Sequence, residues 1–211
     1  MRPDPSTPDG PTRRLVESTG VPGPTVALTF DDGPHPVSTP ALLDALARHG
    51  VRAVFCLWGD HVREHPELVR RVVAEGHVLG NHSTHHDDLS TWDPERVRAD
   101  LRETAAAIEA AAPGVPVPYF RAPFGAWGAT PGVAAGLGMQ PLGWSLAVGD
   151  WDPPPPADEL LRRLEQGLTP GGVVLLHDGG GDRSATVEAV DRLVPRLLAR
   201  GWTFTLPARR G

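Results

Sequence analysis

The sequence predicts an α/β protein built on parallel strands, and three features carry this prediction. Short apolar segments rich in strand-forming residues alternate along the chain with longer segments in which apolar residues recur at helical spacing. Repeated strand–helix units of this kind give parallel strands joined by right-handed crossovers. The segment 172–176 is apolar at nearly every position, as in strands covered on both faces. The chain has 211 residues, which suits one domain of this class.

The first half of the chain contains three predicted strands, each followed by a predicted helix. In order, these are strand 26–31, helix 39–49, strand 53–58, helix 66–75, strand 77–81 and helix 93–112. Leu42 and Leu46 lie on one face of the first helix, and Gly50 ends it. Asp93 and Pro94 open the third helix, because these residue types are favoured at the N-cap and at the first helical position.

The second half continues the pattern with shorter and less regular elements. In order, these are strand 119–122, strand 139–148, helix 158–168, strand 172–177, helix 186–200 and strand 202–206. An open doubly wound sheet and a barrel both accommodate seven parallel strands. Neither a dinucleotide-binding glycine motif nor a phosphate-binding loop follows the first strand.

The domain boundaries follow from composition. Residues 1–24 are rich in proline, threonine and glycine and are expected to form a flexible tail, residues 25–207 are expected to form a single folded domain, and residues 208–211 a short C-terminal tail. No apolar run approaches the roughly 18 residues of a membrane-spanning helix. No export signal is recognisable, so a cytoplasmic protein is expected, with export by another route as the alternative. The sequence makes no prediction of oligomeric state.

Composition excludes several kinds of chemistry. All 20 basic side chains other than histidine are arginine, so a lysine Schiff base and a phosphate-loop lysine are absent. Cys56 is the only cysteine, which excludes an internal disulfide and a cysteine-clustered zinc site. The net charge of −6 gives no reason to expect a nucleic-acid partner. Nine histidines remain, and a metal would be held by histidine and carboxylate ligands.

Chemically reactive side chains lie at, or just after, the carboxyl ends of five of the predicted strands. In chain order these are Asp31 and Asp32, then His82, His85 and His86, then Arg121, then Asp150 and Trp151, then His177 and Asp178. In parallel α/β folds these strand ends share one face, where active sites are built. Five clusters on one face are more than chance explains.

Each cluster taken alone has a simpler structural explanation. Asp31 and Asp32 precede Gly33, which is typical of a turn, and His177 alone would be read as a core histidine. His82 and His86 are four residues apart and would project from one face of a helical turn. With Asp32 they make a set of two histidines and one carboxylate, which leaves a metal position open for water.

In these residues the sequence resembles the polysaccharide deacetylases with a NodB-homology domain, which form carbohydrate esterase family 4. The matching segments are Thr29–Pro34 (TFDDGP), Gly80–His86 (GNHSTHH), Arg121–Gly125 (RAPFG), Asp150–Trp151 (DW) and Leu175–His177 (LLH). They occur in the family's order and cover roughly residues 25–207. The resemblance implies a single distorted, incomplete (β/α)7 barrel. It also implies a metal-dependent hydrolase that removes an acetyl group, chiefly an N-acetyl group, from a sugar or polysaccharide.

The resemblance further implies a role for each matched residue. The metal ligands would be Asp32, His82 and His86, which would hold a divalent ion, Zn²⁺ in the first place and Co²⁺ as the alternative. The catalytic residues would be Asp31 as general base, Arg121 holding Asp31, His177 as general acid, and Asp150 orienting His177 or Arg121. The substrate pocket would contain the backbone N–H of Phe124, which would stabilise the oxyanion, with Trp151 and Leu175 as apolar walls.

The chain departs from the family pattern at several positions. Ala147 stands where relatives often have an additional aspartate, and Phe124 stands where many have tyrosine. Asp87 replaces a frequent proline, and the apolar residues Cys56 and Trp58 are unusual at their positions.

Two alternatives stay open beside deacetylation of a carbohydrate. One is a deacylase or imidase that acts on a small acetamido compound or other metabolite. The other is an inactive relative that only binds carbohydrate, which Ala147 and the aromatic faces of Trp92, Trp127 and Trp151 suggest.

Overall fold

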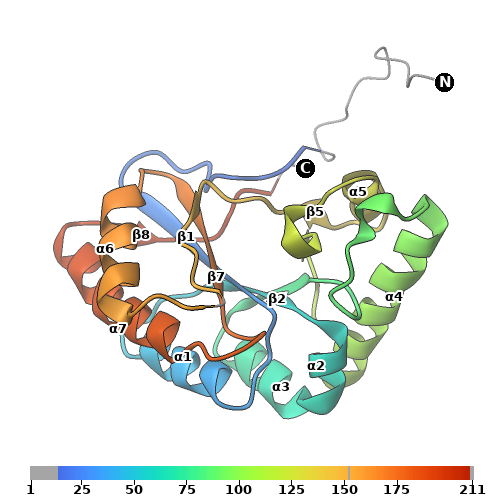
Figure 1. The fold of residues 1–211 in the computed structure, drawn as a ribbon, viewed down its shortest axis with the longest axis horizontal. Coiled ribbons are helices and arrows are strands. Elements are labelled where there is room, and N and C mark those ends of the chain that lie inside the picture. The colour runs from blue at the N-terminus through green and yellow to red at the C-terminus, as the bar shows by residue number, and fades with distance from the viewer. Residues whose placement is uncertain (1–13, 152, 210–211) are drawn as a thin grey trace.

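The computed structural model describes residues 14–151 and 153–209 and shows a curved parallel sheet with helices around its outer side (Figure 1). The strands are β1 (Thr25–Asp31), β2 (Val54–Leu57), β3 (Val78–Asn81), β4 (Tyr119–Phe120), β5 (Gln140–Pro141), β6 (Leu146–Ala147), β7 (Gly172–His177) and β8 (Thr203–Phe204). Their order is β5-β4-β3-β2-β1-β7-β6, with β8 also paired to β1. Every strand pair is parallel, so the predicted α/β class is confirmed.

The helices are α1 (Ser38–Ala47), α2 (Gly59–Glu64), α3 (Pro66–Ala74), α4 (Pro94–Ala111), α5 (Thr130–Gly136), α6 (Ala157–Gly167) and α7 (Ser184–Ala199). The five predicted helices are present. The two additional ones, α2 and α5, have only 6 and 7 residues, which is too short for a helical pattern to stand out. Among the described residues, no helix is both long and apolar enough to cross a bilayer.

The predicted strand over residues 139–148 is wrong, because this stretch contains two strands at opposite edges of the sheet. β5 pairs with β4, and β6 pairs with β7. Residues 142–145, which we call the crossing segment, run between these two edges and span the open seam of the barrel. Apolar composition alone cannot reveal that the two ends of one short run pair with different strands.

The central strand β1 separates two apolar layers and is buried at all seven positions. Val26, Leu28 and Phe30 pack in the core between the sheet and the helices α1, α3, α6 and α7. The alternate residue Ala27 faces the barrel interior, whose core residues are Val16, Ala27, Val54, Cys56, Tyr119, Leu142 and Val173. Because successive side chains of a strand point to opposite faces, both layers constrain the same strand.

Part of the predicted N-terminal tail belongs to the folded domain. Val16 is 1% exposed and forms a bridge with Leu142 of the crossing segment. Ser18 bridges Gly172 and accepts a hydrogen bond from the backbone of Ala208. Sequence periodicity did not reveal these contacts, because the short apolar pair Leu15 and Val16 lies in a segment rich in proline and glycine. The tail residues 1–13 and 210–211 lie outside the described residues.

Replacing Val16 by alanine is expected to lower the free energy of unfolding by about 1–3 kcal/mol, since it removes buried methyl groups. Val21, five residues further along and 47% exposed, supplies the control, because Val21→Ala should change stability by less than about 0.5 kcal/mol. Urea denaturation of both variants measures the difference. Equal stabilities would show that Val16 does not contribute to the core.

His77 makes the stability of the domain dependent on pH. Its Nδ1 accepts the backbone N–H of Ala53 at 3.1 Å, and its ring packs edge-on against Phe55. Burial lowers the pKa of His77 from 6.5 to about 4. Between these two values the unfolded chain binds a proton that the folded chain does not, so stability falls as the pH falls from 6.5 towards 4.

The His77→Asn variant is expected to lose this pH dependence while keeping an acceptor for Ala53, because Oδ1 of asparagine takes the place of Nδ1. Relative to the variant, the wild-type protein should lose about 1–2 kcal/mol of stability between pH 7.5 and pH 5. Denaturation curves at both pH values give the comparison, and the other histidines cancel because both proteins contain them. Parallel pH profiles of the two proteins would show that the pKa of His77 is the same in the folded and the unfolded chain.

Candidate active site

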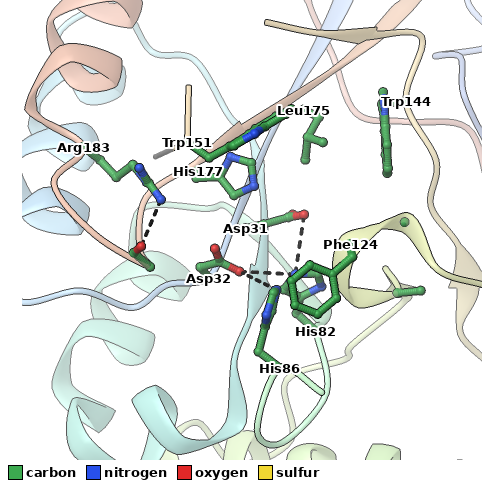
Figure 2. Close-up of a pocket in the computed structure, with 13 residues that line it drawn as sticks. Asp31, Asp32, His82, His86, Phe124, Trp144, Trp151, Leu175, His177 and Arg183 are labelled. Atoms are coloured by element: carbon green, nitrogen blue, oxygen red, sulfur yellow. Dashed lines mark hydrogen bonds and ion pairs between the residues drawn. The ribbon is translucent and has the colours of Figure 1, made fainter. Parts of the chain in front are cut away.

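A cavity of about 430 Å³ opens at the carboxyl ends of the strands and contains most of the residues singled out in the sequence (Figure 2). Its lining includes Asp31, Asp32, His82, His86, Phe124, Trp151, Leu175 and His177. The structure therefore brings together side chains that are up to 146 positions apart, from Asp31 to His177. It also places Trp144 and Arg183 in the lining, which sequence reasoning did not select.

Three side chains converge in this cavity to form a candidate metal site. Asp32 follows β1, and His82 and His86 follow β3; one ligand atom from each lies within 4.8 Å of the others. Oδ1 of Asp32 is 3.3 Å from Nε2 of His82 and 3.2 Å from Nε2 of His86. This donor set of one carboxylate and two imidazoles suits a divalent ion such as zinc.

The predicted helical turn between the two histidines is wrong, although the histidines do meet. Ser83 and His86 have φ angles of 67° and 56°, so the backbone turns twice through the left-handed region. Asn81 stabilises this loop by accepting the N–H of Ser83 and by donating to the carbonyl of Leu101. The exposed His85 pairs with Asp60 outside the cavity, as expected for a residue with a structural role.

The residues of this cluster fit a cation. Oδ1 of Asp32 is buried and has no hydrogen-bond partner among the described residues. Nδ1 of His82 lies 2.8 Å from the carbonyl oxygen of Arg121 and therefore donates to it. The lone pair of His82 Nε2 then faces the Asp32 carboxylate, and two acceptors at this distance require a positive charge between them. A carbonyl that orients a ligating imidazole in this way is typical of metal centres.

The pKa shifts in the cluster follow from burial and from neighbouring charges. Burial favours a raised pKa for Asp32, but the adjacent imidazole of His82, with His177 and His86, holds this pKa well below its usual range. Burial disfavours protonation of His82, but Asp31 and Asp32 outweigh it and raise the His82 pKa. Burial and the nearby His82 lower the His86 pKa. Cation binding therefore competes with a proton on His82 and weakens at low pH.

A buried ion pair lies beside the metal site. Nη1 of Arg121 donates to Oδ1 of Asp31 at 2.7 Å, and the two side chains are 1% and 3% exposed. Thr29 accepts from the same guanidinium nitrogen at 2.8 Å. A charge-assisted hydrogen bond in so buried a position defines where the Asp31 carboxylate lies.

A second carboxylate orients His177, the last residue of β7. Oδ1 of Asp150 lies 2.8 Å from Nδ1 of His177, and Oδ2 accepts the backbone N–H of His177 and the hydroxyl of Thr186. Asp150 was expected to orient either His177 or Arg121, and the structure pairs it with His177. Burial lowers the pKa of His177, but the hydrogen bond and charge of Asp150 outweigh it, so the pKa is raised.

The Asp150→Asn variant is expected to lower the pKa of His177 by about one unit or more, because the opposing negative charge is lost. Wild-type His177 stays protonated above the ordinary value of 6.5, whereas His177 in the variant loses its proton at lower pH. NMR titration of the imidazole resonances measures both values. His85, which pairs with Asp60 instead, is the internal reference and should not change. An unshifted His177 resonance would contradict the role assigned to Asp150.

Apolar side chains form the walls and the mouth of the cavity. Trp151 is 46% exposed and its ring lies edge-on to His177, 5.6 Å away. Leu175 is buried on β7. Phe124 has a left-handed backbone with φ 58°, and its 71% exposed side chain packs against the ring of His86. Trp144, on the crossing segment, was missed because it was assigned to the middle of a strand.

Arg183 holds the glycine-rich loop 179–181, which comes shortly after His177 and lines the cavity. It is 3% exposed and donates to the carbonyl oxygens of Gly179, Gly180 and Asp150. This arginine holds the loop that follows His177 beside Asp32 (Figure 2). No sequence pattern distinguishes it from the surface arginines, because its partners are backbone carbonyls.

The barrel, the cluster of Asp32, His82 and His86, and the two adjacent carboxylate pairs define a metal-dependent hydrolase. Residues 18–142 match the sequence model of the polysaccharide deacetylase family. The chain belongs to this family, so the resemblance seen in the sequence is confirmed.

Similar proteins agree with this assignment. The chain is 39% identical to a chitooligosaccharide deacetylase of Rhizobium leguminosarum bv. trifolii over 85% of this chain and 88% of that protein. It is 33% identical to a peptidoglycan-N-acetylglucosamine deacetylase of Bacillus cereus, over 87% of this chain and 67% of that protein.

Two solved structures share the fold. The crystal structure of a peptidoglycan N-acetylglucosamine deacetylase matches with a TM-score of 0.83 and 31% identity over 91% of this chain and 89% of that one. A family 4 carbohydrate esterase from Streptomyces lividans in complex with acetate matches with a TM-score of 0.77 and 32% identity, over 85% of this chain and 91% of that one. The predicted barrel architecture is confirmed.

Proposed function

We propose that the protein removes the N-acetyl group from N-acetylglucosamine units of an oligosaccharide or polysaccharide. The observation that carries this proposal is the meeting of three groups in one cavity: the cluster of Asp32, His82 and His86, the Asp31–Arg121 pair, and the His177–Asp150 pair. Relatives named as deacetylases of chitooligosaccharides and of peptidoglycan N-acetylglucosamine support the substrate class. A small metabolite as substrate, the alternative raised by the sequence, is not favoured by these relatives.

The cofactor of this reaction is a divalent metal held by Asp32, His82 and His86, and we propose Zn²⁺ as the ion. Two imidazoles and one carboxylate are typical ligands of zinc in hydrolases, and they leave positions open for water and substrate. When bound there, the ion polarises the acetyl carbonyl and lowers the pKa of a water molecule.

The side chains around the cluster supply the proton transfers. Asp31 accepts a proton from the attacking water while Arg121 holds its carboxylate in place. The new C–O bond forms at the acetyl carbon, and the backbone N–H of Phe124 stabilises the negative oxygen. His177, kept protonated by Asp150, gives a proton to the departing amine as the C–N bond breaks. Acetate and the free amino sugar are the products.

Acetate release by metal-loaded protein tests the proposal. The acetylated substrates compared are N-acetylglucosamine oligomers, peptidoglycan fragments, acetyl-xylan and small acetamido compounds. Ring opening of cyclic imides, which releases no acetate, is followed separately by ultraviolet absorbance. Release from the N-acetylglucosamine oligomers is expected, with loss of activity after chelation and recovery when Zn²⁺ is added back. Turnover of only the small amides or imides would favour the metabolite alternative. Tight glycan binding by calorimetry without any product would indicate an inactive carbohydrate-binding protein.

A further inference from the structure

The orientation of Arg121 depends on the crossing segment as well as on the catalytic carboxylate. On one side the guanidinium group meets Asp31 and Thr29. On the other side Nε donates to the carbonyl oxygen of Leu142 at 3.0 Å, and Nη2 donates to that of Gly143 at 3.1 Å. A guanidinium group is planar and its donors diverge in a fixed fork. The two carbonyls of the crossing segment therefore set the plane in which Arg121 meets Asp31.

The crossing segment is held in turn by residues 15–17, which we call the N-terminal strap. The N–H of Val16 donates to the last carbonyl of β5 at 2.9 Å, and the carbonyl of Val16 accepts the N–H of Gly143 at 2.9 Å. The peptide unit between Leu142 and Gly143 is thus hydrogen-bonded at both ends, to Arg121 through its oxygen and to the strap through its N–H. Because a peptide unit is planar and rigid, the strap controls the direction of the oxygen that Arg121 uses.

Side-chain packing keeps the strap against the crossing segment. Val16 is 1% exposed and lies in the interior core with Leu142. A Cβ atom added to Gly143 would lie 2.8 Å from Cγ of Glu17 and 3.4 Å from Cβ of Leu15. A side chain at Gly143 therefore fits only if the exposed Glu17 side chain rotates away or the strap and the crossing segment separate.

We propose that the N-terminal strap positions the general base, acting through the Leu142–Gly143 peptide unit and Arg121 on Asp31. This inference rests on the proposed function for the reaction that Asp31 performs. The hydrogen bonds that support it do not involve the substrate. Separation of the strap from the crossing segment should turn Arg121 and misplace the Asp31 carboxylate. The metal ligands have no hydrogen bond to the strap in the described part of the chain, so metal content should be unchanged.

Two variants test this inference, each with a matched control. Gly143→Ala crowds the strap at Glu17, and Val16→Ala loosens its packing. The control for Gly143→Ala is Gly132→Ala on α5, where an added Cβ would meet no atom within 4 Å. The control for Val16→Ala is Val190→Ala, which removes the same methyl groups from a fully buried residue of α7. In the test variants kcat should fall by about 10- to 100-fold, as for misplacement of a catalytic group by about 1 Å. KM and metal content should stay within twofold of wild type, and both controls should keep wild-type kcat.

A second measurement does not depend on turnover. Hydrogen exchange of the Arg121 Nε–H, followed by NMR, reports the hydrogen bond to Leu142. Exchange should be at least about tenfold faster in Gly143→Ala than in wild type and unchanged in Gly132→Ala. If Gly143→Ala does not fold, Val16→Ala gives both readouts. Wild-type kcat in the folded test variants, or unchanged exchange, overturns the inference. If the wild-type protein releases no acetate from any substrate, the proposed function fails, and the exchange rate alone decides the role of the strap.

Discussion

The Asp31→Asn variant is expected to lose about 10²- to 10⁴-fold in kcat while keeping its metal, because the variant lacks the general base. Asparagine has nearly the same shape as aspartate and still offers an oxygen to Arg121, which donates to Asp31 at 2.7 Å in the wild-type protein. The fold and the adjacent ligand cluster should therefore persist. Steady-state kinetics on N-acetylglucosamine oligomers, with metal analysis of the same preparation, separates loss of the base from loss of the cofactor.

Asp87→Asn is the matched control for Asp31→Asn. Asp87 is exposed and directly follows the metal ligand His86, so its replacement makes the same charge change close to the site without removing a group from the cavity. This control should keep kcat within about twofold of wild type. Retained turnover in Asp31→Asn would exclude Asp31 as the base, and a joint fall in both variants would point to the net charge around the site.

The Asp32→Asn variant is expected to lose the metal itself, together with activity. Asp32 supplies the only carboxylate of the cluster, 3.2–3.3 Å from the two imidazole Nε2 atoms, and the neutral amide removes the negative charge that attracts the cation. Loss of partners outside the ligand shell already lowers metal affinity by about 10- to 100-fold, so loss of a ligand should lower it at least as much. Metal analysis after dialysis and calorimetric titration with Zn²⁺ measure the effect.

His85→Ala is the matched control for Asp32→Asn. His85 lies between the two ligating histidines in the sequence, but its imidazole pairs with Asp60 at 2.7 Å outside the cavity. The variant should bind Zn²⁺ with wild-type affinity. If Asp32→Asn keeps a full complement of tightly bound metal, the ligand assignment is incorrect.

The strand–helix alternation was readable from the sequence because it follows from local periodicity. The long strands β1 and β7 and the helix α4 were predicted close to their observed bounds, since each has a continuous apolar pattern or a clear cap. The crossing segment was mistaken for the middle of a strand, because no periodicity separates β5 from β6. The buried Val16 was missed for a related reason, since its partner Leu142 is 126 positions away.

The residues of the candidate site were also found from the sequence. In a parallel sheet all strands end on one face, so reactive residues at strand ends predict one site without knowledge of distances. The local geometry was less predictable. His82 and His86 meet through a loop with two left-handed residues rather than through a helical turn.

The sequence by itself determined the fold class and the family and selected the candidate site residues, because these depend on residue types at the ends of parallel strands. The tertiary structure alone decided how the catalytic groups are held. Arg121 takes its orientation from carbonyls 21 and 22 positions away, and Asp150 was assigned to His177 rather than to Arg121. Backbone carbonyls are the same at every residue, so a hydrogen bond from a side chain to one of them leaves no pattern in the sequence.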